Sequence, residues 1–247
     1  MVDIWREKAT IRIGSVDRSR RLTLWGIFNF FQETAVSHAA ALGVGLDALM
    51  RNGQVWILSR LSLFVERRPE YGETVQASTW PRQWEKLFAL RDYEIRDAED
   101  HAVVRGRGAW LILDAEKRRP LRVQTILESM PANEGLDAFP EGAAALNPRQ
   151  SLEKTMERSA LYSDIDLYGH TNNARYIQWI QDATDMDILT NAARLRLDIN
   201  YLSEVKPGDK VELWTGPLDH PGGPAFAYEG RRSGQAVFRA ELRTFAG

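Results

Sequence analysis

The chain has 247 residues, carries a formal net charge of −2 and contains no cysteine. This length suits one large domain or two domains of about 120 residues, and the absence of cysteine excludes disulfides, a zinc–thiolate site and a cysteine nucleophile. Because nucleic-acid-binding proteins usually carry a strong basic excess, the charge balance points instead to a small substrate or a protein partner.

The start of the chain lacks the basic segment, the apolar run and the small-residue cleavage site of a secretory signal. The most apolar stretch, residues 24–31, is shorter than the roughly 20 apolar residues that cross a bilayer. We therefore expect a cytoplasmic protein without a membrane span.

The first half of the chain is predicted to form a long helix followed by strands. Apolar residues recur at a spacing of about 3.6 over Leu24–Leu42, which indicates a helix. Farther along, Leu90–Asp97 and Ala102–Leu113 flank an Asp-Ala-Glu-Asp turn, a pattern typical of a β-hairpin.

The middle of the chain has the composition of a connector. Residues 125–150 contain three prolines, two glycines and a run of three alanines, a composition that favours turns over regular structure. We therefore expect an N-terminal module over residues 1–124, a connector over 125–150 and a C-terminal module over 151–247.

The second half shows the same types of element. Helical spacing extends over Asn173–Leu189, and apolar and polar residues alternate over Arg194–Tyr201, which indicates a strand with one buried face. A second hairpin is predicted from Ala225–Arg231 and Ala236–Phe245, which flank an Arg-Ser-Gly-Gln turn.

The two halves also align as a weak internal repeat. Asp17 and its helix match Asp166 and its helix at an offset of 149 (166 minus 17), whereas residues 72–81 match 208–217 at an offset of 136 (208 minus 72). The first half therefore has 13 additional residues (149 minus 136), which we place in Ala41–Gln54. A helix backed by antiparallel strands in each half is an α+β arrangement, and the hotdog fold, a sheet wrapped around a central helix, fits it.

The candidate chemistry lies just before the second helix. Asp166 and His170 flank a tight turn at Gly169, and the first turn of the helix that follows offers backbone N–H groups and a positive dipole end. Such donors can stabilise negative charge on a carbonyl oxygen as water attacks. A carboxylate and an imidazole can orient or deprotonate that water and protonate the leaving group.

Residues 164–176 read Asp-x-Asp-x-x-x-His-x-Asn-Asn-x-x-Tyr, which resembles the signature of the plant and bacterial acyl-acyl carrier protein (acyl-ACP) thioesterases. The resemblance extends to residues 55–61, 79–81, 91–95 and 110–114. It implies a double hotdog fold and the hydrolysis of fatty acyl-ACP thioesters in fatty acid biosynthesis. Acyl carrier protein is then the partner, and neither a metal nor a redox cofactor is implied.

The resemblance also assigns site residues. It adds Glu204, in a segment resembling the Tyr-x-x-Glu-Cys of that family, so that Asp166, His170 and Glu204 become the candidate catalytic residues. The cysteine of the family is replaced here by Val205. The expected mechanism therefore depends on carboxylates, histidine and water, and which carboxylate acts as base or nucleophile stays open.

Three further residues are candidates for substrate binding, namely Tyr168, Asn172 and Asn173. Tyr168 stands where the plant-like pattern has Asn, and a phenol cannot reproduce the paired donor and acceptor of an amide. Asn172 and Asn173 are also favourable residues for starting a helix. A capping role is the favoured interpretation for these two.

The internal alignment predicts one active site per chain. His170 aligns with Arg21 and Glu204 with Arg68, so the first half cannot assemble the same set. We expect the first module to provide the fold and part of the acyl cavity. Two basic clusters are usually solvated surface but would complement an acidic carrier protein: Arg18, Arg20 and Arg21, and Lys117, Arg118, Arg119 and Arg122.

Other interpretations remain open. Asp166 also suits a capping acid, His170 a buried structural histidine and Glu204 an exposed strand end. The alternative functions are a hotdog acyl-CoA thioesterase, a dehydratase acting on 3-hydroxyacyl groups, and a non-catalytic acyl-binding or sensing protein. Association of two tandem chains into a homodimer is open as well.

Overall fold

A computed structural model of the chain describes residues 3–122, 126 and 130–245, so the boundary expected between residues 124 and 125 lies outside the described residues. The helices are α1 (Leu24–Ala41), α2 (Leu46–Arg51), α4 (Asn173–Asp182) and α5 (Met186–Asn191). The strands of the first half are β1 (Trp5–Thr10), β2 (Gln54–Val65), β3 (Thr74–Glu85), β4 (Phe88–Arg96) and β5 (Ala102–Asp114). Those of the second half are β6 (Glu153–Ser159), β7 (Arg194–Tyr201), β8 (Lys210–Pro217), β9 (Ala225–Arg232) and β10 (Gln235–Phe245).

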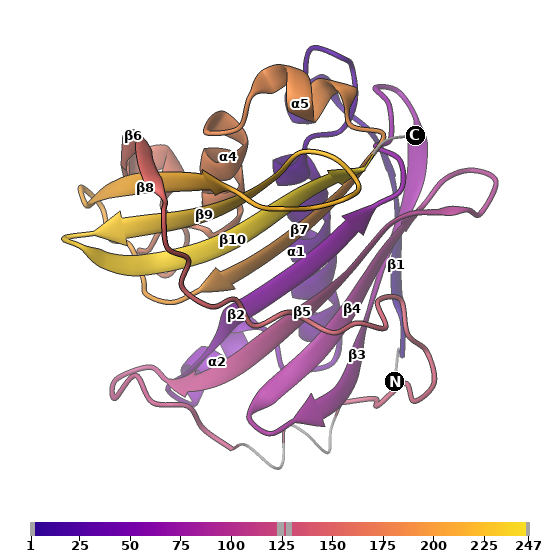
Figure 1. Ribbon diagram of the computed structural model, residues 1–247. Coiled ribbons are helices and arrows are strands. Elements are labelled where there is room, and N and C mark those ends of the chain that lie inside the picture. The colour runs from indigo at the N-terminus through magenta and orange to yellow at the C-terminus, as the bar shows by residue number, and fades with distance from the viewer. Residues whose placement is uncertain (1–2, 123–125, 127–129, 246–247) are drawn as a thin grey trace.

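These strands form one antiparallel sheet of ten strands in the described part of the chain, in the order β1-β3-β4-β5-β2-β7-β10-β9-β8-β6 (Figure 1). The second half of this order repeats the first in reverse, so the two modules are related by an approximate twofold axis between β2 and β7. These central strands pair antiparallel, with Leu63 opposite Leu197. The fold is therefore the expected α+β double hotdog, with two modules sharing one sheet.

The long helices α1 and α4 lie against the inner face of the sheet, behind it in Figure 1. Their buried side chains, among them Ile27, Phe31 and Ile177, belong to one core cluster with residues of both central strands. Each such side chain contributes about 1.5–3 kcal/mol by leaving water. The start of α1 also contacts the end of α4, because the backbone N–H of Trp25 donates to Gln181 Oε1 at 2.8 Å.

One helix is shorter than expected. The spacing predicts a single helix over Asn173–Leu189, but α4 ends at Asp182 and α5 begins at Met186. Asp185 caps α5 by accepting from the backbone N–H of Asp187 at 2.7 Å, and the Thr184 hydroxyl donates to the carbonyl of Ile180 at 2.7 Å. Such side-chain bonds compete with the helical ladder and end it.

The additional residues of the first half also lie elsewhere than expected. They are concentrated in regular elements, since α1 has 18 residues against 10 in α4 and β2 has 12 against 8 in β7. The segment between α1 and β2 is only one residue longer than its counterpart between α4 and β7. The placement of the additional residues in Ala41–Gln54 is therefore wrong.

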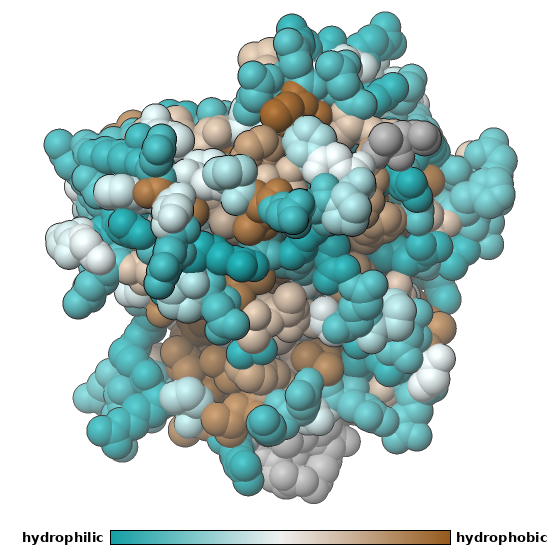
Figure 2. All heavy atoms as spheres, viewed as in Figure 1, coloured by the Kyte–Doolittle hydropathy of each residue, from teal (hydrophilic) through white to brown (hydrophobic). Residues whose placement is uncertain are grey.

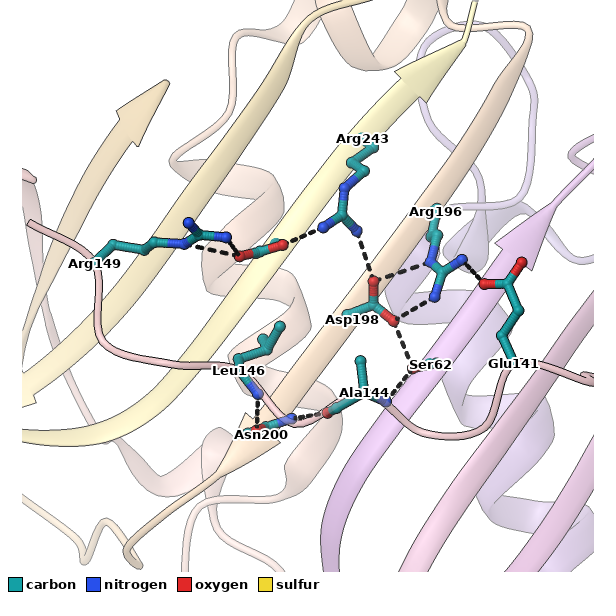
Figure 3. A network of polar contacts seen from close by, with 10 residues as sticks. Ser62, Glu141, Ala144, Leu146, Arg149, Arg196, Asp198, Asn200 and Arg243 are labelled. Atoms are coloured by element: carbon teal, nitrogen blue, oxygen red, sulfur yellow. Dashed lines mark hydrogen bonds and ion pairs between the residues drawn. The ribbon is translucent and has the colours of Figure 1, made fainter. Parts of the chain in front are cut away.

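The connector crosses the outer face of the sheet, opposite the helices (Figure 1). Where β2 and β7 meet, the Ser62 hydroxyl donates to Asp198 Oδ1 at 2.5 Å and accepts from the backbone N–H of Ala144 at 3.1 Å (Figure 3). The Asn200 side chain accepts from the N–H of Leu146 at 2.8 Å and donates to the carbonyl of Ala144 at 2.7 Å. These bonds fix the connector across the junction between the modules.

The face that the connector crosses is mixed in polarity. In Figure 2, which has the same view as Figure 1, hydrophobic residues gather in the lower half, over the region of β2 and β5, and hydrophilic residues dominate the upper half and the rim. Among the described residues, no helix combines the length and the apolar character needed to cross a bilayer.

Candidate active site

The turn before α4 is organised by Asp166. Its Oδ1 accepts from the backbone N–H groups of Tyr168 at 2.9 Å and His170 at 3.3 Å, and its own N–H donates to the carbonyl of His170 at 2.8 Å. Gly169 has φ = 77°, in the left-handed region that glycine adopts without steric cost. The Asp166 carboxylate therefore fixes the turn from which the His170 side chain projects.

Glu204 follows β7 and is brought to this turn by backbone contacts. The N–H of Thr171 donates to the carbonyl of Val205 at 2.8 Å, which ties the turn to the residue after Glu204. The Arg232 guanidinium donates to the carbonyl of Glu204 at 2.8 Å and to Asp209 at 2.6 Å. Val205 is fully buried, so its side chain is packing rather than chemistry.

The two candidate side chains meet. His170 Nε2 lies 3.1 Å from Glu204 Oε2, and the other carboxylate oxygen, Oε1, forms an ion pair with Arg118. His170 and Glu204 keep 23% and 32% of their side-chain surface exposed, so water and substrate can reach them. Burial lowers the pKa of His170, and the cations Arg118 and Lys206 lower it further, although Asp166 opposes them. The imidazole is therefore neutral near pH 7 and can accept a proton.

The residues expected to bind substrate have different surroundings. Asn172 is the N-cap of α4, with its side-chain oxygen accepting from the N–H of Ala174 at 2.8 Å. The carbonyl of Asn173 accepts from the Tyr201 hydroxyl at 3.0 Å. Burial and the charge of Asp166 raise the pKa of Tyr168, which keeps its phenol protonated as a hydrogen-bond donor.

Two N–H groups in the first turn of α4, those of Ala174 and Arg175, are not free, contrary to the expectation for this turn. The N–H of Ala174 is taken by the Asn172 side chain, and those of Arg175 and Asn172 donate to the carbonyls of Asn172 and Asp164. These bonds use two of the donors that usually make a helix start an anion site, and the N–H of Asn173 lies outside them. A carbonyl oxygen bound here would therefore meet fewer backbone donors than expected.

The first module contains the same turn with different chemistry. Asp17 Oδ1 accepts from the N–H groups of Ser19 at 2.8 Å and Arg21 at 3.3 Å, and Leu22 N–H donates to the carbonyl of Pro69 at 2.8 Å. At the position of Glu204 stands Arg68, whose guanidinium lies 2.5 Å from Asp17 Oδ2. The acid of this turn is therefore neutralised inside the module.

The sequence interpretation missed two cations at the site. Arg118 was grouped with the basic cluster after β5, and nothing in the local sequence distinguishes it from Lys117 or Arg119. Arg232 ends β9, and only the pairing of the strands brings it to Glu204. Within the described residues, His, Asp and Glu side chains form no group of three or more suited to a metal ion.

Two hotdog modules on one chain, with a histidine and a carboxylate in contact at their junction, define a tandem hotdog protein with a site suited to hydrolysis. The family model described as the acyl-ACP thioesterase N-terminal domain matches residues 3–129, and that of the acyl-ACP thioesterase C-terminal domain matches residues 148–243. The chain therefore belongs to the acyl-ACP thioesterase family.

Curated relatives include plant enzymes. The chain is 24% identical over 236 residues to a chloroplastic palmitoyl-acyl carrier protein thioesterase of Cuphea hookeriana, covering 89% of this chain and 56% of the relative. It is 24% identical over 230 residues to a chloroplastic oleoyl-acyl carrier protein thioesterase of Coriandrum sativum, covering 86% and 62%. The chain thus spans little more than half the length of these relatives.

Solved structures share the whole fold. An acyl-ACP thioesterase from Bacteroides thetaiotaomicron superposes with a TM-score of 0.84 at 23% identity, covering 99% of this chain and 98% of that one. The 12:0-ACP thioesterase from Umbellularia californica gives a TM-score of 0.83 at 20% identity, with coverage of 99% and 98%. The double hotdog architecture therefore extends over nearly the entire chain.

Proposed function

We propose that this protein hydrolyses fatty acyl-ACP thioesters to a free fatty acid and the carrier thiol. The observation that carries the proposal is the contact between His170 Nε2 and Glu204 Oε2 at 3.1 Å, beside the turn built by Asp166. Membership of the family supports the reaction, and the names of the plant relatives support acyl carrier protein as the carrier.

In the proposed mechanism His170 is the general base and Glu204 orients it. A neutral imidazole that carries its proton on Nε2, the atom in contact with Glu204, leaves Nδ1 to take a proton from water as that water attacks the thioester carbonyl. Collapse of the tetrahedral intermediate breaks the C–S bond, and the imidazolium returns its proton to the departing thiolate. The carboxylate stabilises the imidazolium in between.

Asp166 and Tyr168 have supporting roles in this mechanism. Oδ1 of Asp166 is used by the turn, and we assign Oδ2 to hold the attacking water. Because the N–H groups of Ala174 and Arg175 are used within the turn, the protonated phenol of Tyr168 is the donor that we assign to the carbonyl oxygen. This assignment gives a role to Tyr168, which stands where the plant-like pattern has Asn.

The two modules divide the work in this proposal. The C-terminal module, residues 151–247, supplies Asp166, His170 and Glu204, and the N-terminal module, residues 1–124, lines the acyl pocket. In the first module the Arg68–Asp17 ion pair occupies the equivalent position, which supports a single site per chain.

The test is a panel of acyl-ACP and acyl-CoA substrates with saturated chains from octanoyl to stearoyl, followed by thiol release. It compares wild type with D166N, H170Q and E204Q, and with H101Q as control, whose imidazole is 77% exposed on the turn between β4 and β5. We expect H170Q to lose about 10²–10⁴-fold in kcat, as general bases do, and H101Q to match wild type.

Each alternative gives a distinct outcome. Near-normal turnover in D166N, H170Q and E204Q overturns the site assignment. Faster hydrolysis of acyl-CoA than of acyl-ACP overturns the carrier, and an enoyl product without free thiol indicates a dehydratase. Stoichiometric acyl binding without turnover indicates a sensing protein.

A further inference from the structure

Arg118 belongs to the first module but reaches the site of the second. It closes the turn after β5, where Asp114 Oδ1 accepts from the N–H groups of Glu116 at 3.0 Å and Lys117 at 2.7 Å. The N–H of Arg118 donates to the carbonyl of Asp114 at 2.9 Å, and Arg118 has φ = 55°. A left-handed residue held by a side-chain-capped turn has the direction of its Cα–Cβ bond fixed by the backbone.

The pairing of the strands explains why this turn meets Glu204. The central strand β2 pairs with β5 on one side and with β7 on the other, and the end of β5, Asp114, lies opposite the start of β2, Gln54. The end of β7 lies at the same end of β2, since Asn200 is opposite Arg60. The segments that follow β5 and β7 therefore project from one end of the sheet.

The Glu204 carboxylate is held from two sides. Oε1 pairs with the Arg118 guanidinium, and Oε2 lies 3.1 Å from His170 Nε2. The side chains of Arg118 and Glu204 are 40% and 32% exposed, and ion pairs with this much exposure add little to stability. The pair instead fixes the orientation of the Glu204 carboxylate. With Oε1 held by Arg118, Oε2 faces His170.

We propose that Arg118 is a positioning residue that holds Glu204 toward His170, so that the first module completes the active site of the second. The inference rests on the proposed hydrolytic function. It assigns to one member of the basic cluster a task distinct from attraction of an acidic carrier. Its neighbour Arg119, also exposed, provides the matched control.

Arg118 also influences the titration of His170. The groups that act on this imidazole are Asp166, which raises its pKa, Arg118 and Lys206, which lower it, and Glu204, which is in contact with it. Removal of Arg118 takes away one of two cations. The pKa of His170 then rises, and the acid limb of the kcat profile moves to higher pH.

The experiment compares R118Q, R118K and R119Q with wild type. We expect R118Q to lower kcat about 10- to 100-fold, as misplaced catalytic groups do, with KM changed far less. The acid limb should move to higher pH, because one of the two cations that lower the pKa of His170 is removed. R118K, which keeps the charge without the planar fork, should recover part of kcat and most of the pH profile. R119Q, whose effect on attraction of the carrier would appear in KM, should keep the kcat and the pH profile of wild type.

A second measurement makes the inference independent of turnover. Nuclear magnetic resonance titration of the imidazoles, with H170Q assigning the signal, should show a higher pKa of His170 in R118Q and no change in R119Q. Equal kcat and equal His170 titration in R118Q and wild type overturn the inference. Wild-type protein that hydrolyses none of the thioesters overturns the proposed function, and the titration still decides whether Arg118 sets the environment of His170.

Discussion

The two modules differ in the residue that meets the acid of the turn, which is Arg68 in the first module and Glu204 in the second. The stability contributed by the Arg68–Asp17 ion pair can be measured and tests this difference. The side chains of this pair are 5% and 22% exposed, and the Arg68 guanidinium also donates to the carbonyl of Leu189 in the second module at 3.0 Å. D17N keeps one acceptor for the turn but leaves the buried guanidinium without its carboxylate. Removing one partner of a buried pair costs about 3–5 kcal/mol, which the partial exposure of Asp17 reduces to about 2–3 kcal/mol.

The double variant isolates the interaction between the two side chains. R68M removes the guanidinium together with its desolvation, and its remaining cost of about 1–2 kcal/mol comes from the unsatisfied carbonyl of Leu189 and from the lost partner of Asp17, whose Oδ1 keeps its bonds to the turn. In D17N/R68M no unpaired guanidinium remains, so the double variant should be more stable than the sum of the single effects predicts, by at least about 1 kcal/mol. Urea unfolding followed by circular dichroism measures all four proteins.

The pH dependence of the free energy of unfolding provides a second test of the same ion pair. Burial alone would raise the pKa of Asp17, but the hydrogen bonds from Ser19 and Arg68 and the charge of Arg68 together lower it. A carboxyl whose pKa is lower in the folded state stabilises the protein above its ordinary pKa, and this stabilisation is lost as the pH falls through the folded value. The difference between wild type and D17N should therefore narrow below pH 3.8, the ordinary value. Additive single effects, or a D17N cost that stays constant into acid, would refute the reasoning.

Two further predictions concern the pH profile and the core. Because burial and Arg118 lower the pKa of His170 below 6.5, wild-type kcat/KM should still exceed half of its maximum at that pH, and a half-maximum above 6.5 in a pH series contradicts a neutral His170 base. Arg91 is 6% exposed and contacts His38 and Thr79, with no carboxylate paired to it in the described residues, so R91M should change the free energy of unfolding by less than about 1 kcal/mol or stabilise the protein. A loss above about 3 kcal/mol in urea unfolding contradicts this.

Much of the fold could be predicted because its signals are local. The helix over Leu24–Ala41 and the hairpin strands follow from periodicity in contiguous residues, and the two offsets of the repeat relate one half to the other. The break at Thr184 and Asp185 could not be predicted in this way. Apolar spacing continues through it, and the Thr184 hydroxyl finds a second partner, Tyr228, only in the folded sheet at 2.7 Å.

The candidate site shows the same limit. Asp166 and His170 are four residues apart and belong to one turn, so their proximity is readable from the sequence. Glu204 needed the resemblance to a family, because its distance from the turn is set by the contact between Thr171 and Val205. No pattern in the sequence pointed to a role for Arg118 at the site. Its position there depends on the order of strands around β2, which no local pattern contains.

The two modules show how one backbone arrangement separates structure from chemistry. In each, an acid fixes a turn through two N–H groups at matching distances, and a residue after the second long strand reaches that turn. In the first module that residue is Arg68, which is buried and neutralises the charge of Asp17. In the second it is Glu204, which leaves Asp166 unneutralised and takes its own counter-charge from Arg118 on the other module. Because this second pair is partly exposed, the histidine beside it stays accessible, and the site that we propose for hydrolysis lies where a residue of the first module reaches the second.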